Sequence, residues 1–158
     1  MSAKTDQATT ARSYLLASVG DFAAWRRVSR QAAHLQTGRL WFPAPLGRIS
    51  GGKLPIWDAR TAARAYLAHA LTVAYLPTEL IALMEQEETA QPGPIPSLLC
   101  GVAEVAAMIR VSSSGAARIT FHSWFPKPLD YVNDKYAVWD ELRVREALVL
   151  KGGYRLYT

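Results

Sequence analysis

The sequence predicts an α+β fold in which two or three N-terminal helices pack on a C-terminal antiparallel sheet of about four strands. Two observations favour this fold: helix-capping residues recur before residue 90, and apolar and polar residues alternate in several runs after residue 97. A chain of 158 residues is long enough to bury roughly 70% of the surface of its unfolded state. We therefore expect a single α+β domain over 11–158, divided into a helical part at 11–90, a proline-rich connector at 91–96 and a β-rich part at 97–158.

The first ten residues are polar and lack the apolar core of a signal peptide, so residues 1–10 are expected to be a short disordered leader. A short helix over about 10–19 is expected next. No run of 18 uninterrupted apolar residues occurs in the sequence, and this predicts a protein without a membrane span.

The next predicted element is one amphipathic helix over 22–37, with Asp21 as its N-cap and Gly38 as its end. At 100° per residue the two faces of this helix differ sharply in chemistry. The apolar side consists of Phe22, Trp25, Val28, Ser29, Ala32 and Leu35, and the polar side consists of Arg26, Arg27, Arg30, Gln31 and His34.

Residues 38–57 are rich in proline and glycine and predict a loop or an irregular hairpin. Trp41, Phe42 and Trp57 bracket this segment, and such large aromatic side chains are expected to hold it against the core. Because the segment is much longer than a three- or four-residue turn, the predicted helix at 22–37 does not suggest a helix–turn–helix motif.

A central helix is expected over 59–76 with Asp58 as its N-cap, and a third helix is expected to start at Pro77 and to end among acidic residues. After the connector, residues 102–111 and 117–125 are interpreted as a hairpin, although the first arm also fits helical spacing. A second hairpin is expected where Leu142 to Leu150 alternate before Gly152 and Gly153. No internal repeat at a solenoid period is apparent.

The sequence contains no strong signature of a catalytic, metal or cofactor site. Cys100 stands in an apolar segment, where a thiol is usually buried with a raised pKa, and the three histidines are far apart. We therefore expect no metal and no cofactor, and lean against an enzyme. The enzymatic alternative is a pocket between helices and sheet that would use His69, His122, Tyr66 or Asp140.

The distribution of charge is the most informative feature of the sequence. Residues 1–76 carry ten basic and three acidic residues, whereas residues 77–158 carry eight basic and ten acidic residues. This asymmetry indicates an anionic partner for the first part of the chain. The residues expected to bind it are Arg26, Arg27, Arg30, His34, Arg60 and Arg64.

The first hypothesis for function is a small non-enzymatic binding protein, an inhibitor or accessory factor, that docks an acidic protein or a nucleoprotein complex through this basic helix face. Direct binding of nucleic acid by the same arginines is the alternative. The single cysteine favours a reducing cytoplasm, no membrane partner is expected, and self-association stays open.

Overall fold

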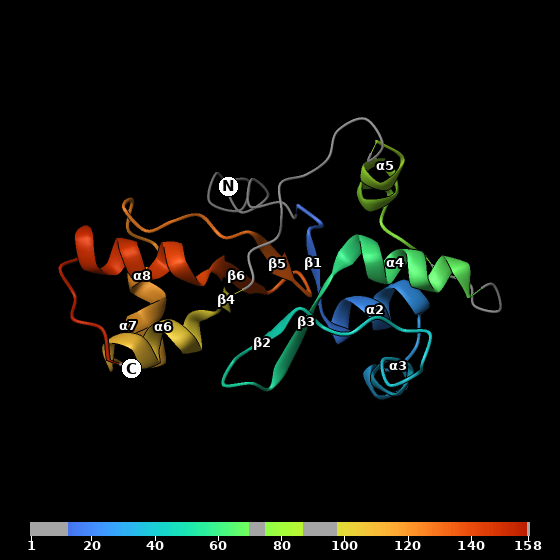
Figure 1. The fold of residues 1–158 in the computed structure, drawn as a ribbon, viewed down its shortest axis with the longest axis horizontal. Coiled ribbons are helices and arrows are strands. Elements are labelled where there is room, and N and C mark those ends of the chain that lie inside the picture. The colour runs from blue at the N-terminus through green and yellow to red at the C-terminus, as the bar shows by residue number, and fades with distance from the viewer. Residues whose placement is uncertain (1–12, 70–74, 87–97, 158) are drawn as a thin grey trace, which may run out of the picture.

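The computed structural model describes residues 13–69, 75–86 and 98–157, so the predicted leader at 1–10 and connector at 91–96 lie outside the described residues. The fold is α+β, as predicted (Figure 1). Its arrangement differs from the predicted one, because strands and helices alternate in both halves of the chain and no four-stranded sheet forms among the described residues. None of the helices in the described ranges has the length and hydropathy of a membrane-spanning segment.

The first half forms one α+β unit over residues 13–69, here called the first unit. Its three-stranded antiparallel sheet has the order β1-β3-β2, and two short helices separate β1 from the β2–β3 hairpin. The elements are β1 (Leu16–Ala17), α2 (Val19–Arg26), α3 (Arg30–Gln36), β2 (Gly47–Ile49), β3 (Leu54–Asp58) and α4 (Ala59–Ala68). A further helix, α5 (Thr78–Gln86), packs on this unit through the buried Leu80.

The second half, residues 98–157, forms the second unit and repeats the same order of elements. Its sheet has the order β4-β6-β5, and two short helices again separate the first strand from the hairpin. The elements are β4 (Leu99–Cys100), α6 (Val102–Ile109), α7 (Ser113–Ile119), β5 (Asp130–Val132), β6 (Tyr136–Asp140) and α8 (Glu141–Leu150).

The two units are an internal duplication that the sequence prediction missed. Residues 15–51 align with 98–134, and residues 53–66 align with 135–148, with Gly52 as the single unmatched residue. Of the 51 aligned positions, 19 are identical. Strand register follows the alignment, since Leu16 pairs with Asp58 in the first sheet and Leu99 pairs with Asp140 in the second.

Each unit has its own core, and one edge-to-face aromatic pair recurs at equivalent positions, as Phe42 with Trp57 and as Phe125 with Trp139. Phe22 contacts Trp25, Phe42, Trp57 and Tyr66 edge to face, with ring centroids 5.1–5.7 Å apart. In both units the tryptophan before the last helix donates a 2.9 Å hydrogen bond to a proline carbonyl, from Trp57 to Pro43 and from Trp139 to Pro126. The prediction that Phe42 and Trp57 hold the long segment against the core is therefore confirmed.

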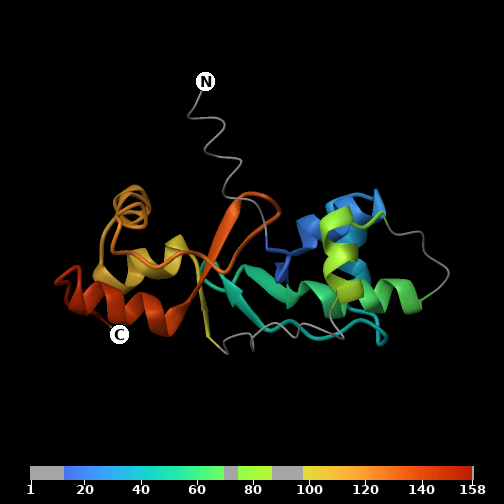
Figure 2. The ribbon, with the colours of Figure 1, turned by 90° about the horizontal axis from the view of Figure 1, so that it is seen from above.

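The two units meet through a third apolar cluster at the centre of the molecule. It contains three buried residues from each unit at equivalent positions: Leu16, Ile49 and Ile56, and Leu99, Val132 and Val138. Figures 1 and 2 show the two sheets side by side at the centre, with the helices of each unit toward opposite ends. Because the same surface of each unit faces the other, the contact has the self-complementary character of a two-fold dimer interface.

Several predicted elements are wrong in detail. The single helix over 22–37 is two helices, because the chain turns at Arg27, and Asp21 lies inside the first turn of α2 rather than at its N-cap. The predicted hairpin at 102–111 and 117–125 is the helix pair α6 and α7. The alternating run from Leu142 to Leu150 lies in helix α8, because Asp140 caps it with a 3.0 Å hydrogen bond from the Leu142 N–H.

Candidate nucleic-acid interface

Helices α2 and α3 are joined by a turn of three residues, Arg27 to Ser29. Arg27 adopts the left-handed conformation (φ 53°) and ends α2, and the Val28 N–H then donates to the Ala23 carbonyl at 3.1 Å. Ser29 starts α3, since its hydroxyl oxygen accepts a 3.1 Å hydrogen bond from the Ala32 N–H. Ala33 of α3 is fully buried in the core of the unit, which keeps the opposite side of α3 toward solvent.

The second unit builds the same turn from the same three residue types. Arg110 is left-handed (φ 55°), the Val111 N–H donates to the Ala106 carbonyl at 3.0 Å, and the Ser112 hydroxyl accepts from the Gly115 N–H at 3.1 Å. Two helices joined by a turn of three or four residues have the connection of a helix–turn–helix, so each unit contains one. The expectation that the segment 22–37 carries no such motif is wrong, because this segment is two helices and not one. In each, a β-hairpin follows the second helix.

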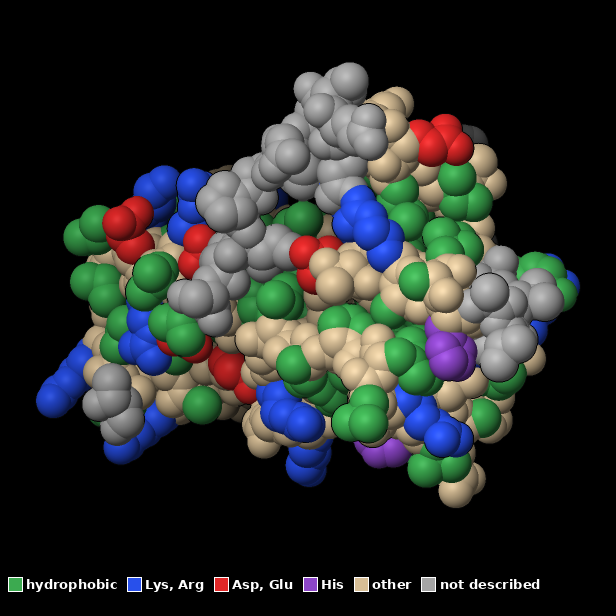
Figure 3. Space-filling view, turned by 45° about the vertical axis from the view of Figure 1, so that its right-hand side comes forward, with side chains coloured by type: hydrophobic (Ala, Val, Ile, Leu, Met, Phe, Trp, Pro, Cys, Tyr) green, Lys and Arg blue, Asp and Glu red, His purple; other side chains and the backbone are tan. Residues whose placement is uncertain are grey.

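The exposed side of α3 is polar and basic. Its exposed residues are Arg30, Gln31, His34 and Leu35, and the β2–β3 hairpin adds the exposed Arg48 and Lys53. We call these six residues the α3 surface. In Figure 3, basic and histidine side chains lie along the lower edge of the molecule, where Figure 1 places α3 and this hairpin.

The α3 surface has no carboxylate of its own, because residues 22–57 contain no Asp or Glu. The carboxylates on either side of this segment are engaged in the fold. Asp21 is buried and accepts from the Ser18 N–H at 2.8 Å, and Asp58 caps α4 by accepting from the N–H groups of Arg60 and Thr61. Glu104 of the second unit accepts from the Ser50 and Gly51 N–H groups at the hairpin tip, so the positive charge of the α3 surface is opposed by no carboxylate of its own segment but by one beside the hairpin tip.

The structure distributes the six predicted binding residues over different environments. Arg30 and His34 are exposed on α3. Arg27 is exposed in the turn, where its guanidinium carbon lies 3.6 Å from the centroid of the Tyr75 ring, and that of Arg26, half-buried, lies 5.4 Å from the Tyr66 ring centroid. Both stack as cation–π pairs.

The remaining two predicted residues lie on α4. Arg64 is exposed there, whereas Arg60 is 8% exposed and belongs to the interior. Arg60 and Arg64 therefore do not form the exposed pair that their spacing predicts, and Arg60 contributes no accessible guanidinium to a binding surface.

The second unit presents a related but less basic surface. The exposed residues of α7 include Ser113, Ser114 and Arg118, and the hairpin adds Asp134 and Lys135. A hollow of about 420 Å³ lies between α7 and this hairpin. Its lining includes Ala117, Phe121 and Tyr131 of the second unit, together with Ser50 from the hairpin of the first unit.

The residues of the enzymatic alternative are divided between the two units, with Tyr66 and His69 in the first and His122 and Asp140 in the second, and they have structural contacts. Tyr66 is buried in the core of the first unit, and burial raises its pKa to about 12. His69 stacks on Trp41 with centroids 4.0 Å apart, and His122 stacks on Trp124 at 5.5 Å. Among the described residues, no group of three or more His, Cys, Asp or Glu side chains could hold a metal ion.

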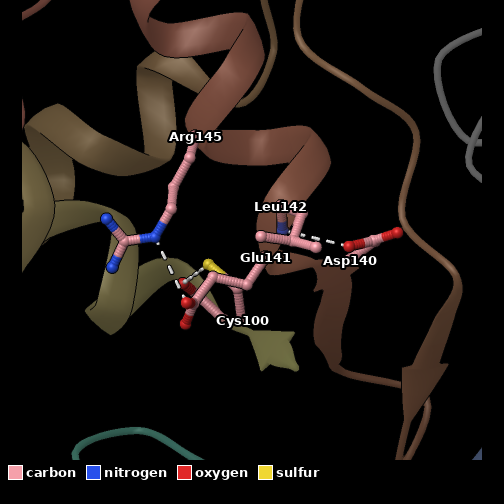
Figure 4. A network of polar contacts seen from close by, with 6 residues as sticks. Cys100, Asp140, Glu141, Leu142 and Arg145 are labelled. Carbon is pink, nitrogen blue, oxygen red and sulfur yellow. Dashed lines mark hydrogen bonds and ion pairs between the residues drawn. The ribbon is translucent and has the colours of Figure 1, made fainter. Parts of the chain in front are cut away.

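Cys100 and the acidic residues beside it form a further polar cluster, in the second unit (Figure 4). The thiol donates to the Gly101 carbonyl at 3.4 Å, while Glu141 accepts a 3.2 Å hydrogen bond from Arg145 Nε. Burial, reinforced by the negative charges of Glu104 and Glu141, raises the pKa of the thiol to about 12. A nucleophilic thiol needs the opposite shift, so this geometry argues against catalysis by Cys100.

The predicted binding residues omit Gln31, Leu35, Arg48 and Lys53 of the α3 surface and all of the second unit, and Leu35 is exposed although it was expected on the apolar side of its helix. The indication that could have revealed them is the repeated Arg-Val-Ser at 27–29 and 110–112, followed in both halves by Trp-Phe-Pro and then by Trp-Asp. No protein-family model, curated protein or solved structure matches this chain.

Proposed function

We propose that the protein binds double-stranded DNA, with α3 as a recognition helix and the β2–β3 hairpin as a flanking contact. The observation that supports this proposal is the helix–turn–helix of the first unit, whose second helix exposes Arg30, Gln31 and His34. In helix–turn–helix proteins the second helix lies in the major groove, where its side chains contact base edges.

The chemistry of the α3 surface suits the major groove. Arginine can bind guanine through two hydrogen bonds, and glutamine can bind adenine in the same way. Arg48 and Lys53 lie on the hairpin, where their charges suit phosphates beside the groove. An acidic protein partner, the expectation from charge alone, would need neither the three-residue turn nor a helix with this polar face, so DNA is the favoured ligand.

The proposal is tested by fluorescence anisotropy with a labelled duplex of about 30 base pairs of mixed sequence at about 50 and 200 mM salt. We expect binding that weakens steeply with salt, since bound cationic side chains release counterions. Arg30→Glu should weaken binding at least about tenfold and lower the salt slope.

The matched control is Arg64→Glu, which makes the same charge change on the exposed side of α4. It should reduce affinity much less than Arg30→Glu does. Equal losses in both variants would indicate nonspecific attraction to a basic protein and would contradict recognition through α3. Absence of binding at low salt would remove DNA as the ligand, and capture of acidic proteins would become the next experiment.

A further inference from the structure

We infer that a single chain engages two half-sites on one DNA duplex, with the two units acting as the two subunits of a built-in dimer that reads two different half-site sequences. This inference rests on the proposed function. Helix–turn–helix dimers place two recognition helices on half-sites one helical turn, or a multiple of it, apart. Here the two helix–turn–helix units belong to one chain.

The contact between the units is reciprocal, as in a two-fold dimer. Asp21 at the start of α2 accepts a 2.9 Å hydrogen bond from the Asn133 N–H at the tip of the second hairpin. Glu104, the residue equivalent to Asp21, accepts from the N–H groups of Ser50 and Gly51 at the tip of the first hairpin, at 3.1 and 2.8 Å. With the central apolar cluster, these bonds hold each hairpin against the other unit and fix the two recognition helices relative to each other.

A further set of contacts between the units, made by Leu129 and Asp130, has no counterpart among the described residues. The buried carboxylate of Asp130 accepts hydrogen bonds from the Leu16 and Ser13 N–H groups of the first unit, at 3.0 and 3.2 Å. Glycine stands at the equivalent position, 47, so the first unit cannot return this bond. The interface is therefore a two-fold contact that is supplemented on one side by the hydrogen bonds to Asp130.

The second unit also has the charge that a DNA contact needs. Residues 98–158 contain eight basic and six acidic residues, so this unit is net positive, and the acidity of the second half of the chain comes from the segment at 79–88. Several carboxylates of the second unit are already engaged in contacts within the protein. Glu104 and Asp130 accept hydrogen bonds from the first unit. Asp140 caps α8, and Glu141 forms an ion pair with Arg145. Arg118 and Lys135 stay exposed on the side of α7 and its hairpin.

The surface beside α7 continues onto the hairpin of the first unit. The hollow beside α7 is lined by Ser113 and Ala117 of that helix, by Lys135 of its own hairpin, and by Ser50 of the first hairpin. A ligand lying along α7 therefore reaches the tip of the first unit's hairpin as well. A duplex, which is longer than either unit, suits such a continuous surface.

The two half-sites should differ in sequence because the exposed helix residues differ at every equivalent position. Arg30, Gln31, His34 and Leu35 of α3 correspond to Ser113, Ser114, Ala117 and Arg118 of α7. Side chains that can form paired hydrogen bonds with purines stand at the start of α3, and small hydroxyl side chains stand there in α7. We expect the half-site of α3 to be the more strictly specified one.

The test selects bound sequences from a pool of duplexes with about 30 randomised base pairs, using the full chain. We expect two enriched blocks of different sequence, centred one helical turn or a multiple of it apart, and one chain per selected duplex by native mass spectrometry. The decisive variant carries R30S, Q31S, H34A and L35R, which give α3 the exposed residues of α7. Its selected site should become an inverted repeat of the second block.

A second variant, Arg118→Ala, keeps the inference falsifiable if the fourfold variant does not fold. It should weaken binding to the selected duplex at least about fivefold and relax the sequence of the second block alone. A single enriched block, two chains per duplex, or no effect of Arg118→Ala would overturn the two-site inference while leaving DNA binding intact. If neither the pool nor any selected duplex binds at low salt, the proposed function itself fails.

Discussion

Gly20 and Asn133 form a tight contact between the units that a mutation can test. Gly20 lies in the first turn of α2, and a Cβ built on it would lie 2.5 Å from Cγ of Asn133. In the equivalent contact on the other side of the interface the residues are Ala103 and Ser50, a larger and a smaller side chain. Glycine at position 20 leaves room for the larger Asn133, whereas the smaller Ser50 leaves room for Ala103.

Two opposing effects set the magnitude for Gly20→Ala. Alanine is favoured over glycine in a helix by roughly 0.5–1 kcal/mol. Overpacking at a tight contact costs typically about 1–3 kcal/mol. We therefore expect Gly20→Ala to lower the free energy of unfolding by about 1 kcal/mol in the natural chain. In a chain that carries Asn133→Ser, Gly20→Ala should instead raise the free energy of unfolding by about 0.5–1 kcal/mol, because the overlap with the Asn133 side chain is removed.

Urea unfolding of the four chains of this double-mutant cycle measures the coupling, which we expect to be about 1–2 kcal/mol. Ser50 already occupies the equivalent left-handed position (φ 57°), so serine at 133 (φ 54°) is compatible with the backbone. Ala103→Gly is the matched control and should lose only the helix preference, roughly 0.5–1 kcal/mol. If Gly20→Ala has the same effect with Asn133 and with serine, the described contact between the units is refuted.

Three other predictions concern single sites. Ser29→Ala and Ser112→Ala should each destabilise the protein by about 1 kcal/mol in urea unfolding through loss of the cap hydrogen bond, whereas Asp at either position should preserve most of the stability. Ile49→Ala should cost about 2–5 kcal/mol, because Ile49 is buried between the units, and the conservative Ile49→Val should cost only about 0.5–1.5 kcal/mol. Cys100 has a folded pKa of about 12 against an ordinary 9.0, so its contribution is fully present below pH 9 and is lost as pH rises from 9 toward 12, at up to about 1.4 kcal/mol per pH unit. Cys100→Ala should remove this component from the pH dependence of the unfolding free energy between pH 9 and 12, and an unchanged profile would contradict the assigned burial of the thiol.

Sequence reasoning succeeded where one residue decides the local structure. Asp58 caps α4 as predicted, and the end of α3 at Gln36 lies close to the predicted end at 37. It failed at Arg27, because a left-handed residue that ends a helix is usually glycine or asparagine, and arginine gives no such indication. Because this turn was not predicted, a single helix was expected over 22–37 where the structure has α2 and α3.

The second half was misread for a related reason. In 117–125 and 142–150, apolar residues at every second position favour strands, but the same residues also satisfy a helix that is buried on one side. Capping decided the outcome: Ser112 and Asp140 start helices there. The candidate site was found only in part, because a count of arginines along the chain cannot distinguish Arg60, which is buried, from Arg30, which is exposed.

Comparison of the two units shows which short sequence motifs both retain. Identity is concentrated at the turn (Arg-Val-Ser), at the Trp-Phe-Pro before the hairpin, and at the Trp-Asp that leads into the last helix, all of which have the same contacts in both units. The four exposed positions compared between α3 and α7 differ without exception. The shared turn and hydrogen bonds constrain both units in the same way, whereas an exposed helix face is constrained only by what it binds. The two units also differ at buried positions, such as Phe22 against Val105 and Tyr66 against Leu148, so divergence alone does not identify a binding face. Exchanging the four α3 residues for those of α7 changes the proposed contact surface while leaving these cores untouched, and it therefore tests the inference most directly.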